Sequence, residues 1–456
     1  MEAGPRTWRV VEFARSVRWE DLPPEVHSQA IRCVLDLCGA AVAGSRTQAA
    51  HSAVSYALYG HGNGPSTIIG TSATSTPVGA ALANGFATSA LDVDDGYRPV
   101  KGHPGAVVFP AVLAAAEEAE SSGIEFLIAL VVGYEVAMRA GRILHSLYDS
   151  YHGSGAWAPI GAAAGVARSL GCNAEQTWHA LGIAEFHAAM APEMRSVEHP
   201  SMLKDGIGWG AMVGIASGQL AARGFTGIPA LFDVTGPGTR FIESLEDEYL
   251  ILDLYFKPYA CCRWAQPAIA AALSVARRVG ATATNVARVR VHTFEAATHL
   301  RSVAPRTTEE AQFSLAWPVA CALIDGEVGP EQVTGESLDD PVRRRLAARV
   351  EVVVDAELEE AFPERALAWV EIETMDGSRA RSGVLGAWGD AGTRFGDTEL
   401  TKKFRSLTDP LLGSGHARKL LSAILRLPES PDLGEVTSLL RLPPSRTCEG
   451  YNRAEF

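Results

Sequence analysis

The spacing of the hydrophobic residues changes near Arg263, and this change limits the folds open to the chain. Before it, apolar residues recur at helical spacing in runs rich in alanine and glycine, which predict a tightly packed helical bundle. After one more helical run, 266–279, the spacing becomes two, as in strands with one buried face. The sequence therefore predicts a mainly α protein, with a large all-helical domain and a smaller α+β domain inserted into it.

The helical runs share apolar residues on one face or residues that begin and end helices. They cover residues 25–44, 78–91, 109–120, 123–141, 155–170, 174–189 and 205–222. Thr76-Pro77 supplies a cap and a first-turn proline for the second run. Charges and prolines interspersed among the alanines favour a soluble bundle over membrane spans.

Three alternating stretches, 286–293, 350–354 and 369–374, predict strands, and Asp376-Gly377 predicts the turn after the third. A helical tail from Asp397 is expected to break at Pro410 and at Leu427-Pro428. Single cores stop growing near roughly 250–300 residues, so a chain of 456 residues is expected to form two domains. Their predicted bounds are 1–261 with 396–456 for the helical domain, and 262–395 for the α+β domain.

The charge balance excludes some partners. Lys and Arg total 40 and Asp and Glu total 53, which gives a net charge of -13 and argues against a nucleic-acid or anionic membrane surface. A small anion in a local basic pocket stays possible. Residues 1–18 mix charges, and the apolar tract 126–132 is far shorter than the ~20 residues of a spanning helix. From these two features we expect no targeting signal and no membrane segment. Seven cysteines without C-x-x-C spacing suggest a reduced protein, so we expect a cytoplasmic location.

Polar side chains gather in short segments within apolar surroundings. The first begins with Asp92-Val93-Asp94-Asp95 and continues to Lys101 and His103, just beyond a predicted helix end. Helix capping and a glycine turn are the ordinary explanation. One histidine supplies too few ligands for a metal site, so we expect none.

Two further segments open helices rich in alanine and glycine. His152 precedes one such helix, whose free N–H groups suit a carboxylate, and Lys204 precedes another. Ordinary caps and a solvated lysine are the alternatives. The glycines from Gly206 to Gly210 follow no clear strand and have no acidic partner downstream, so a dinucleotide loop is weakly supported.

The last two segments place charge among aromatic residues. Lys257-Pro258-Tyr259 is followed by Cys262-Arg263, where the alternative is a lysine stem packed on rings. Glu309 to Ser314 leads to Trp317-Pro318 and a helix, and alone it is merely amphipathic. Hydrolase motifs such as G-x-S-x-G and H-E-x-x-H are absent, as is a Walker loop.

The order and spacing of these segments resemble the MmgE/PrpD family, which includes 2-methylcitrate dehydratase, cis-aconitate decarboxylase and iminodisuccinate epimerase. The resemblance runs from Glu25 to Lys402-Lys403-Phe404. It implies a large helical domain with a smaller α+β lid, and a homodimer. The motifs that carry it are Asp92-x-Asp94-Asp95 with His103-Pro104, Arg223-Gly224-Phe225-Thr226-Gly227, Lys257-Pro258-Tyr259 with Cys262-Arg263, and Phe313-Ser314-Leu315.

By position, the resemblance implies a catalytic set of Asp92, His103, His152, Lys204 and Lys257. A second set is assigned to substrate binding: Lys101, Tyr259, Arg263 and Trp317. The sequence also departs from the family pattern. Gly96-Tyr97 stands where the decarboxylases have threonine, a histidine is missing from Lys204-Asp205-Gly206-Ile207-Gly208, and Trp317 lies near a tyrosine position of the decarboxylases.

The family's reactions act on carbon next to a carboxylate, where loss of a proton leaves an enediolate-like anion that needs nearby positive charge. Lys204, Lys257 and Arg263 are expected to supply that charge, and Arg263 to grip a carboxylate with two hydrogen bonds. Clustering is expected to lower the pKa values of the lysines and make one a base. His103 or His152 is suited to acid or base chemistry near neutral pH.

The leading hypothesis is a cofactor-independent lyase of the dehydratase type, acting on a small di- or tricarboxylate. The first alternative is an epimerase, isomerase or decarboxylase that works on a similar polycarboxylate through the same carbanion. The second is a non-catalytic polycarboxylate-binding protein that keeps the fold, which the altered motif positions would explain.

Overall fold

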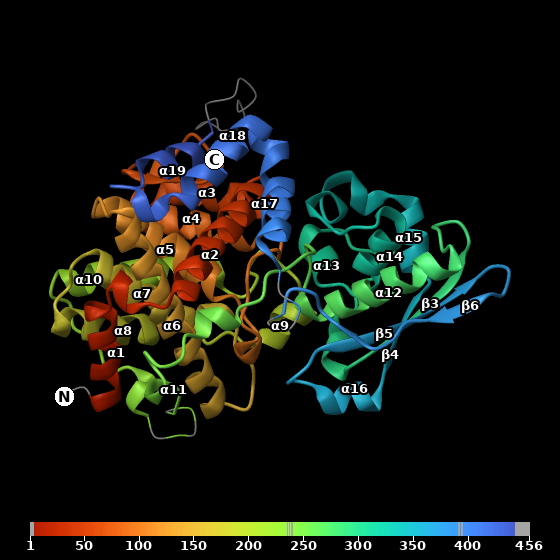
Figure 1. The fold of residues 1–456 in the computed structure, drawn as a ribbon, viewed down its shortest axis with the longest axis horizontal. Helices are drawn as coiled ribbons and strands as arrows, with labels where there is room; N and C mark the ends of the chain where they lie inside the picture. Colours follow the sequence, from red (N-terminus) through yellow and green to blue (C-terminus); the bar gives the residue numbers. More distant parts are fainter. Residues whose placement is uncertain are drawn as a thin grey trace.

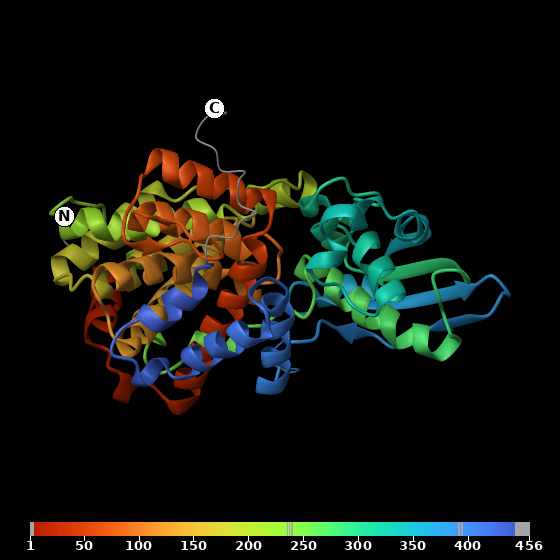
Figure 2. The ribbon, with the colours of Figure 1, turned by 90° about the horizontal axis from the view of Figure 1, so that it is seen from above.

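The computed structural model describes residues 4–442 except 235, 237, 239, 391, 392 and 394. Within this part the chain forms a larger lobe of helices and a smaller lobe built around a sheet (Figure 1, Figure 2). Helices from the beginning of the chain and from its last described segment pack together in the larger lobe. The predicted class, mainly α with a smaller α+β part, is confirmed. Cys448 lies outside the described residues.

The larger lobe is a bundle whose central helices approach one another through small residues. A Cβ atom added at Gly161 would lie 2.2 Å from the carbonyl oxygen of Gly133, and one at Gly214 would lie 2.4 Å from the Cβ of Ala162. Its helices up to the smaller lobe are α1 (Pro5–Ser16), α2 (Pro24–Gly44), α3 (Gln48–Gly60), α4 (Pro77–Ser89), α5 (Pro104–Glu118), α6 (Gly123–Leu147), α7 (Ala158–Ser169), α8 (Ala174–His187), α9 (Glu193–Glu198), α10 (Ile207–Ala222) and α11 (Arg240–Glu243). Two short antiparallel strands, β1 (Ser66–Thr67) and β2 (Thr74–Ser75), lie between α3 and α4.

Helix ends in the larger lobe follow local capping chemistry. Thr76 accepts a hydrogen bond from the backbone N–H of Gly79, and Pro77 occupies the first turn of α4, as predicted. Helix α10 begins at Ile207, two residues after the predicted start, because Lys204 and Gly206 both have positive φ. This left-handed entry places the Lys204 side chain before the helix, where it faces the smaller lobe.

The smaller lobe packs α12 (Gln266–Val279) on a mixed sheet. Its strands are β3 (Val286–Thr293), β4 (Val350–Val354), β5 (Leu367–Thr374), β6 (Arg379–Arg381) and β7 (Leu385–Gly386), and its other helices are α13 (Thr308–Gln312), α14 (Ala316–Asp325), α15 (Pro341–Ala347) and α16 (Ala356–Ala361). The order is β4-β3-β5-β6, with β3 and β4 parallel, the other neighbours antiparallel, and β7 beside β5. The three predicted strands are confirmed, and Gly377, with φ 85°, lies between β5 and β6.

The last described segment returns to the larger lobe as α17 (Asp397–Leu412), α18 (Ser414–Leu425) and α19 (Gly434–Leu440). The predicted break at Pro410 is wrong: the proline lies in the last turn of α17, where the helix tolerates one missing hydrogen bond, and Gly413 ends it. The break at Leu427-Pro428 is confirmed, since α18 stops at Leu425. Helix α17 packs on α2 and places the buried Lys403 ammonium on Asp36 and on the carbonyl oxygen of Val93, 2.6 Å away.

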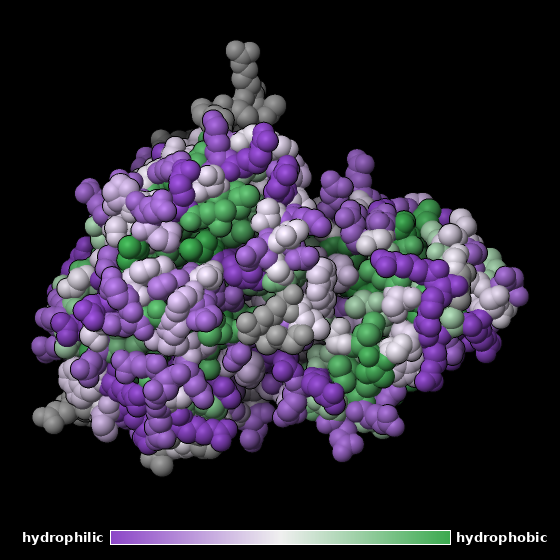
Figure 3. Space-filling view, in the orientation of Figure 1, coloured by the Kyte–Doolittle hydropathy of each residue, from purple (hydrophilic) through white to green (hydrophobic). Residues whose placement is uncertain are grey.

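The two lobes share apolar packing at their junction. The core of the smaller lobe includes Leu91, Val93 and Val197, which the larger lobe supplies. Figure 3 shows hydrophilic side chains over most of one face, with hydrophobic patches on both lobes. No helix in the described part of the chain is both long and apolar enough to cross a membrane. The junction is thus a packed contact, and a cavity lies within it.

Candidate active site

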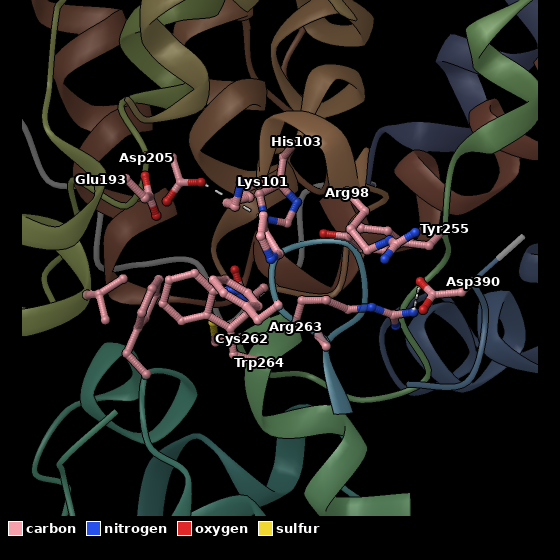
Figure 4. Close-up of a pocket in the computed structure, with 16 residues that line it drawn as sticks. Arg98, Lys101, His103, Glu193, Asp205, Tyr255, Cys262, Arg263, Trp264 and Asp390 are labelled. Atoms are coloured by element: carbon pink, nitrogen blue, oxygen red, sulfur yellow. Dashed lines mark hydrogen bonds and ion pairs between the residues drawn. The ribbon is translucent and has the colours of Figure 1, made fainter. Parts of the chain in front are cut away.

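A cavity of about 50 Å³ opens between the two lobes (Figure 4). Its two walls differ in chemistry. The wall from the larger lobe carries ionisable side chains, namely Asp92, Arg98, Lys101, His103, Glu193 and Asp205. The wall from the smaller lobe is mainly aromatic or apolar, with Trp264, Phe313, Phe362, Pro363 and Ala366. Four of the nine residues predicted for the site therefore line the cavity, Asp92, Lys101, His103 and Arg263, and two more contact Asp92.

Asp92 lies at the centre of the charged wall, three residues after the end of α4. Its buried carboxylate lies between two ammonium groups: Lys204 Nζ is 3.1 Å from one oxygen and Lys257 Nζ is 3.0 Å from the other. Burial raises the pKa of Asp92, but the two lysines outweigh burial and hold it well below its usual range. Asp92 is therefore ionised, and the three side chains together carry one positive charge.

Lys257 is fully buried and directly contacts Asp92. Burial lowers the pKa of Lys257, but the negative charge of Asp92, with smaller contributions from Tyr255 and Asp94, raises it above the ordinary lysine value. The expectation that clustering lowers the lysine pKa values is therefore wrong for Lys257, because a carboxylate lies between the two ammonium groups. A lysine in this state stabilises an anion and does not act as a base.

Lys204 is held by the smaller lobe. Its ammonium donates to Gln312 Oε1 and lies 4.8 Å from the centre of the Phe313 ring. Gln312 in turn donates from Nε2 to the carbonyl oxygen of Ala90, 2.8 Å away, at the end of α4. The last residue of α13 thus contacts both the lysine and the end of α4, just before Asp92.

His103 is oriented by acceptors on one side of its ring. Nδ1 lies 2.7 Å from the carbonyl oxygen of Asp95 and 3.2 Å from Asp94 Oδ2, so Nδ1 carries a proton. Nε2 lies 3.4 Å from Lys257 Nζ and 4.0 Å from Asp205 Oδ2. Burial and Lys257 lower the pKa of His103, but Asp94 outweighs them and the pKa is raised. Nε2 is thus a stronger base than an ordinary imidazole.

Asp94 and Asp95 both contact His103 at Nδ1, and neither was assigned to the site from the sequence. Burial, followed by the charge of Asp36, raises the pKa of Asp95 to about 7, and its carboxyl accepts hydrogen bonds from Tyr134 and from the backbone N–H of Gly105. The sequence did contain a signal: the Asp-x-Asp-Asp motif has three acidic residues within four positions, which is more than a helix cap needs.

Lys101, which the prediction about clustered lysines did not cover, is a lysine whose pKa is lowered. Burial, helped by Arg98 and opposed by Glu364, lowers the pKa of Lys101 to about 8. Its ammonium lies 3.6 Å from the centre of the Tyr151 ring, and its side chain reaches the cavity. Lys101 therefore changes charge close to neutral pH.

Three charged residues at or next to the cavity have a left-handed backbone conformation. Asp92, Lys101 and Lys204 have φ values of 53°, 51° and 49°. Each such residue costs roughly 1–3 kcal/mol unless the surroundings compensate, and such residues concentrate at functional sites. The backbone is thus strained where it presents charge to the cavity.

Arg263 belongs to the cavity but its donors are occupied. The guanidinium donates to Gln266 Oε1 at 2.9 Å, to the Trp388 carbonyl at 3.0 Å and to Asp390, and it lies 4.2 Å from the centre of the Tyr255 ring. Its predicted grip on a substrate carboxylate would require breaking this network.

Arg98 also lines the cavity, and the sequence prediction missed it. The side chain is half-buried, and within the described part of the chain no ion pair or hydrogen bond engages its guanidinium. Arg98 lies between Asp92 and His103, so its position in the most polar motif was the available signal. A free guanidinium at the cavity suits a carboxylate.

The other three predicted residues neither line the cavity nor contact Asp92 in the described part of the chain. His152 packs beside His145 and Tyr148, with ring centres 6.2 and 5.4 Å away. Trp317 is fully buried and donates its indole N–H to the Gln332 carbonyl, so it belongs to the core of the smaller lobe. The carbonyl of Tyr259 accepts a hydrogen bond from the side chain of Gln266, and its ring stays half-buried.

Two buried carboxyl groups that the sequence analysis did not assign, Glu193 and Asp205, line the cavity beside His103. Neither contacts Arg98 or Arg263 in Figure 4, where the pair lies at the opposite end. Over the described residues, no group of three or more histidine, cysteine, aspartate or glutamate side chains is arranged to hold a metal ion.

Comparison with known proteins identifies relatives along nearly the whole chain. The MmgE/PrpD N-terminal domain model matches residues 9–244, and the MmgE/PrpD C-terminal domain model matches residues 259–429. The chain is 26% identical to cis-aconitate decarboxylase of Homo sapiens, covering 92% of each protein. It is 24% identical to the cis-aconitate decarboxylase-like protein oryM of Aspergillus oryzae, over 96% of this chain and 97% of that protein. A cis-aconitate decarboxylase of Aspergillus terreus is 24% identical over 96% of each chain.

Proposed function

The chain belongs to the MmgE/PrpD family, and on this premise we propose that it is a lyase that acts on a small di- or tricarboxylate. One observation carries the proposal: the ionised Asp92 holds the ammonium groups of Lys204 and Lys257 close to the basic Nε2 of His103, beside the cavity between the two lobes. This arrangement supplies a base and positive charge within a few ångströms, as loss of a proton next to a carboxylate requires.

The roles follow from the contacts. A substrate carboxylate binds Arg98, whose guanidinium is free, and His103 Nε2 removes the proton from the adjacent carbon. Asp94 and the Asp95 carbonyl keep the imidazole in the required tautomer. Lys257, 3.4 Å from Nε2, stabilises the negative charge that develops on the carboxylate oxygens.

Loss of carbon dioxide is the second candidate, because the relatives named above are cis-aconitate decarboxylases. Decarboxylation leaves the same carbanion next to a carboxylate and needs the same positive charge. His103 would then return a proton to carbon.

The test is proton NMR in deuterated water with citrate, 2-methylcitrate, cis-aconitate, malate and iminodisuccinate. Deuterium entering the carbon next to a carboxylate, together with a new alkene or loss of carbon dioxide, is the expected result. His103→Gln should abolish it, while His416→Gln in α18 should not. Equal rates in the wild type and in His103→Gln would refute the proposal. The homodimer and the cytoplasmic location stay predictions.

A further inference from the structure

Glu193 and Asp205 form a carboxyl pair in the cavity that the proposed reaction has not yet used. Glu193 is the first residue of α9, and Asp205 follows Lys204 in the chain. They are 7% and 5% exposed, and Figure 4 shows them side by side. Within the described part of the chain, Glu193 Oε2 is buried and has no hydrogen-bond partner. An unpartnered buried oxygen of this kind needs either a proton or a ligand.

Burial and mutual repulsion oppose a second negative charge on the pair. Burial, followed by the charges of Asp205 and Asp92, raises the pKa of Glu193 well above its usual range. Burial also raises the pKa of Asp205, although His103 and the lysines oppose it. Two carboxyl groups that share a buried site keep one proton between them. The cavity therefore contains an acid as well as the base His103.

The carboxyl pair and the two arginines of the cavity occupy opposite ends. Arg98 and Arg263 lie at the end beside Tyr255, and Glu193 and Asp205 lie at the other end. A substrate carboxylate is attracted to the first end and repelled from the second. A neutral hydroxyl suits the second end, because it accepts a hydrogen bond from a protonated carboxyl and donates one to a carboxylate oxygen.

We infer that Glu193 and Asp205 are the acid of the dehydratase-type reaction, and that they protonate the hydroxyl group that leaves as water. This rests on the proposed function in its dehydratase form. The pair also lies close to the base, since Asp205 Oδ2 is 4.0 Å from His103 Nε2.

The step balances without a further reagent. His103 Nε2 takes the proton from the carbon next to the carboxylate, and the electron pair of that C–H bond forms the carbon–carbon double bond. The C–O bond to the hydroxyl breaks, and its oxygen takes the proton from the Glu193–Asp205 pair and leaves as water. The proton on His103 then returns to the pair across the 4.0 Å between Nε2 and Asp205 Oδ2.

Glu193→Gln separates the acid from the base, because glutamine keeps the shape of the side chain but transfers no proton. Elimination of water from citrate, 2-methylcitrate or malate should slow by about 10²- to 10⁴-fold. Deuterium exchange at the carbon next to the carboxylate, which needs only His103, should stay within a few-fold of the wild type. Glu198→Gln, on the same helix and paired with His299, is the matched control and should change neither rate.

The pH profile adds a readout that a structural role would not change. In the wild type, elimination should fall as pH rises through the pKa of the pair, since the acid must be protonated. The slow residual rate of Glu193→Gln should lack this alkaline limb, and Glu193→Asp should restore it at a lower rate. Glu193→Asp also serves if the glutamine variant does not fold.

Two results would overturn the inference and leave the lyase standing: equal elimination by the wild type and Glu193→Gln, or parallel loss of elimination and exchange in a folded Glu193→Gln. Release of carbon dioxide from cis-aconitate without elimination from any hydroxy acid would also overturn the inference, because no hydroxyl group then leaves, and it would keep the lyase. Neither exchange nor turnover with any compound of the set would overturn the proposed function itself.

Discussion

The two walls of the cavity differ in what they contribute. The larger lobe presents buried charge from loops at helix ends, with Asp92 between Lys204 and Lys257. The smaller lobe presents rings that are continuous with its own core: Trp264 packs edge-on against Phe362, and Phe294 stacks on Phe362 with ring centres 4.3 Å apart. In the proposed reaction the bundle supplies the reacting groups, and the rings of the smaller lobe face them with apolar surface, which strengthens the charges opposite.

The clearest way to break the charged wall is Lys257→Met. The variant leaves Asp92 with one cation and removes the charge beside His103 Nε2, so turnover should fall by about 10³-fold. Steady-state kinetics measure this, and circular dichroism checks the fold. Lys402→Met, exposed on α17, is the control. A fall of less than tenfold would mean that the paired lysines do not stabilise the anion.

Arg263 lies at the aromatic wall, and its guanidinium is held by Asp390. The variant Asp390→Ala tests whether this contact matters for binding. The substitution removes a charged hydrogen bond from Arg263, worth about 1.5–3 kcal/mol, so KM should rise by roughly 10- to 100-fold with a smaller change in kcat. Asp339→Ala, which breaks the exposed pair with Arg344, should leave both constants unchanged. An unchanged KM in Asp390→Ala would show that Arg263 does not shape the binding site.

The buried Asp95, which lies behind the charged wall, makes the stability of the folded protein depend on pH. Its folded-state pKa of about 7 lies above its ordinary value of 3.8, so the folded state binds more protons between these values. Stability contributed by neutral Asp95 is therefore present at acidic pH and lost as pH rises toward 7, by at most about 1.4 kcal/mol per pH unit. Urea unfolding from pH 4.5 to 7.5 should show a flatter decline for Asp95→Asn. Asp149→Asn, an exposed aspartate, should keep the wild-type slope.

The smallest effect concerns Phe313, a ring of the smaller lobe that lies close to the Lys204 ammonium. Phe313→Leu keeps apolar volume but removes the face 4.8 Å from Lys204 Nζ. A cation–π contact is worth about 0.5–2 kcal/mol, so kcat/KM should fall by roughly two- to tenfold. Phe225→Leu, half exposed, is the control. A loss as large as that of Lys257→Met would mean that the walls do not divide the work as described.

Most of the secondary structure could be predicted from local patterns in the sequence. Strand β3 and helix α12 match their predicted bounds, because alternation, helical spacing and caps depend on neighbouring residues. The prediction at Pro410 was wrong because a proline in the last turn costs one hydrogen bond and need not stop a helix there. The start of α10 was missed because a left-handed lysine leaves no mark in the residue pattern.

The site was predictable only where motifs mark it. Asp92 and Lys257 are 165 positions apart, and the family resemblance, not periodicity, indicated that they belong to one site. Glu193 and Arg98 were missed because a single charged residue reads as surface until the packing around it is known. The same packing places Trp317 in the core of the smaller lobe, away from the cavity. Burial of isolated charges is a tertiary property, and the sequence pattern does not carry it.

The left-handed backbones of Asp92, Lys101 and Lys204 also leave a trace that natural variation can reveal. At Asp92 and Lys204, glycine would break a buried ion pair, so stability alone resists that change. At Lys101, whose ammonium contacts the Tyr151 ring, glycine relieves the backbone strain and removes a charged group, so mainly selection for chemistry resists it. A glycine at position 101 in a diverging gene copy would therefore mark the loss of its catalytic duty before any damage to the fold.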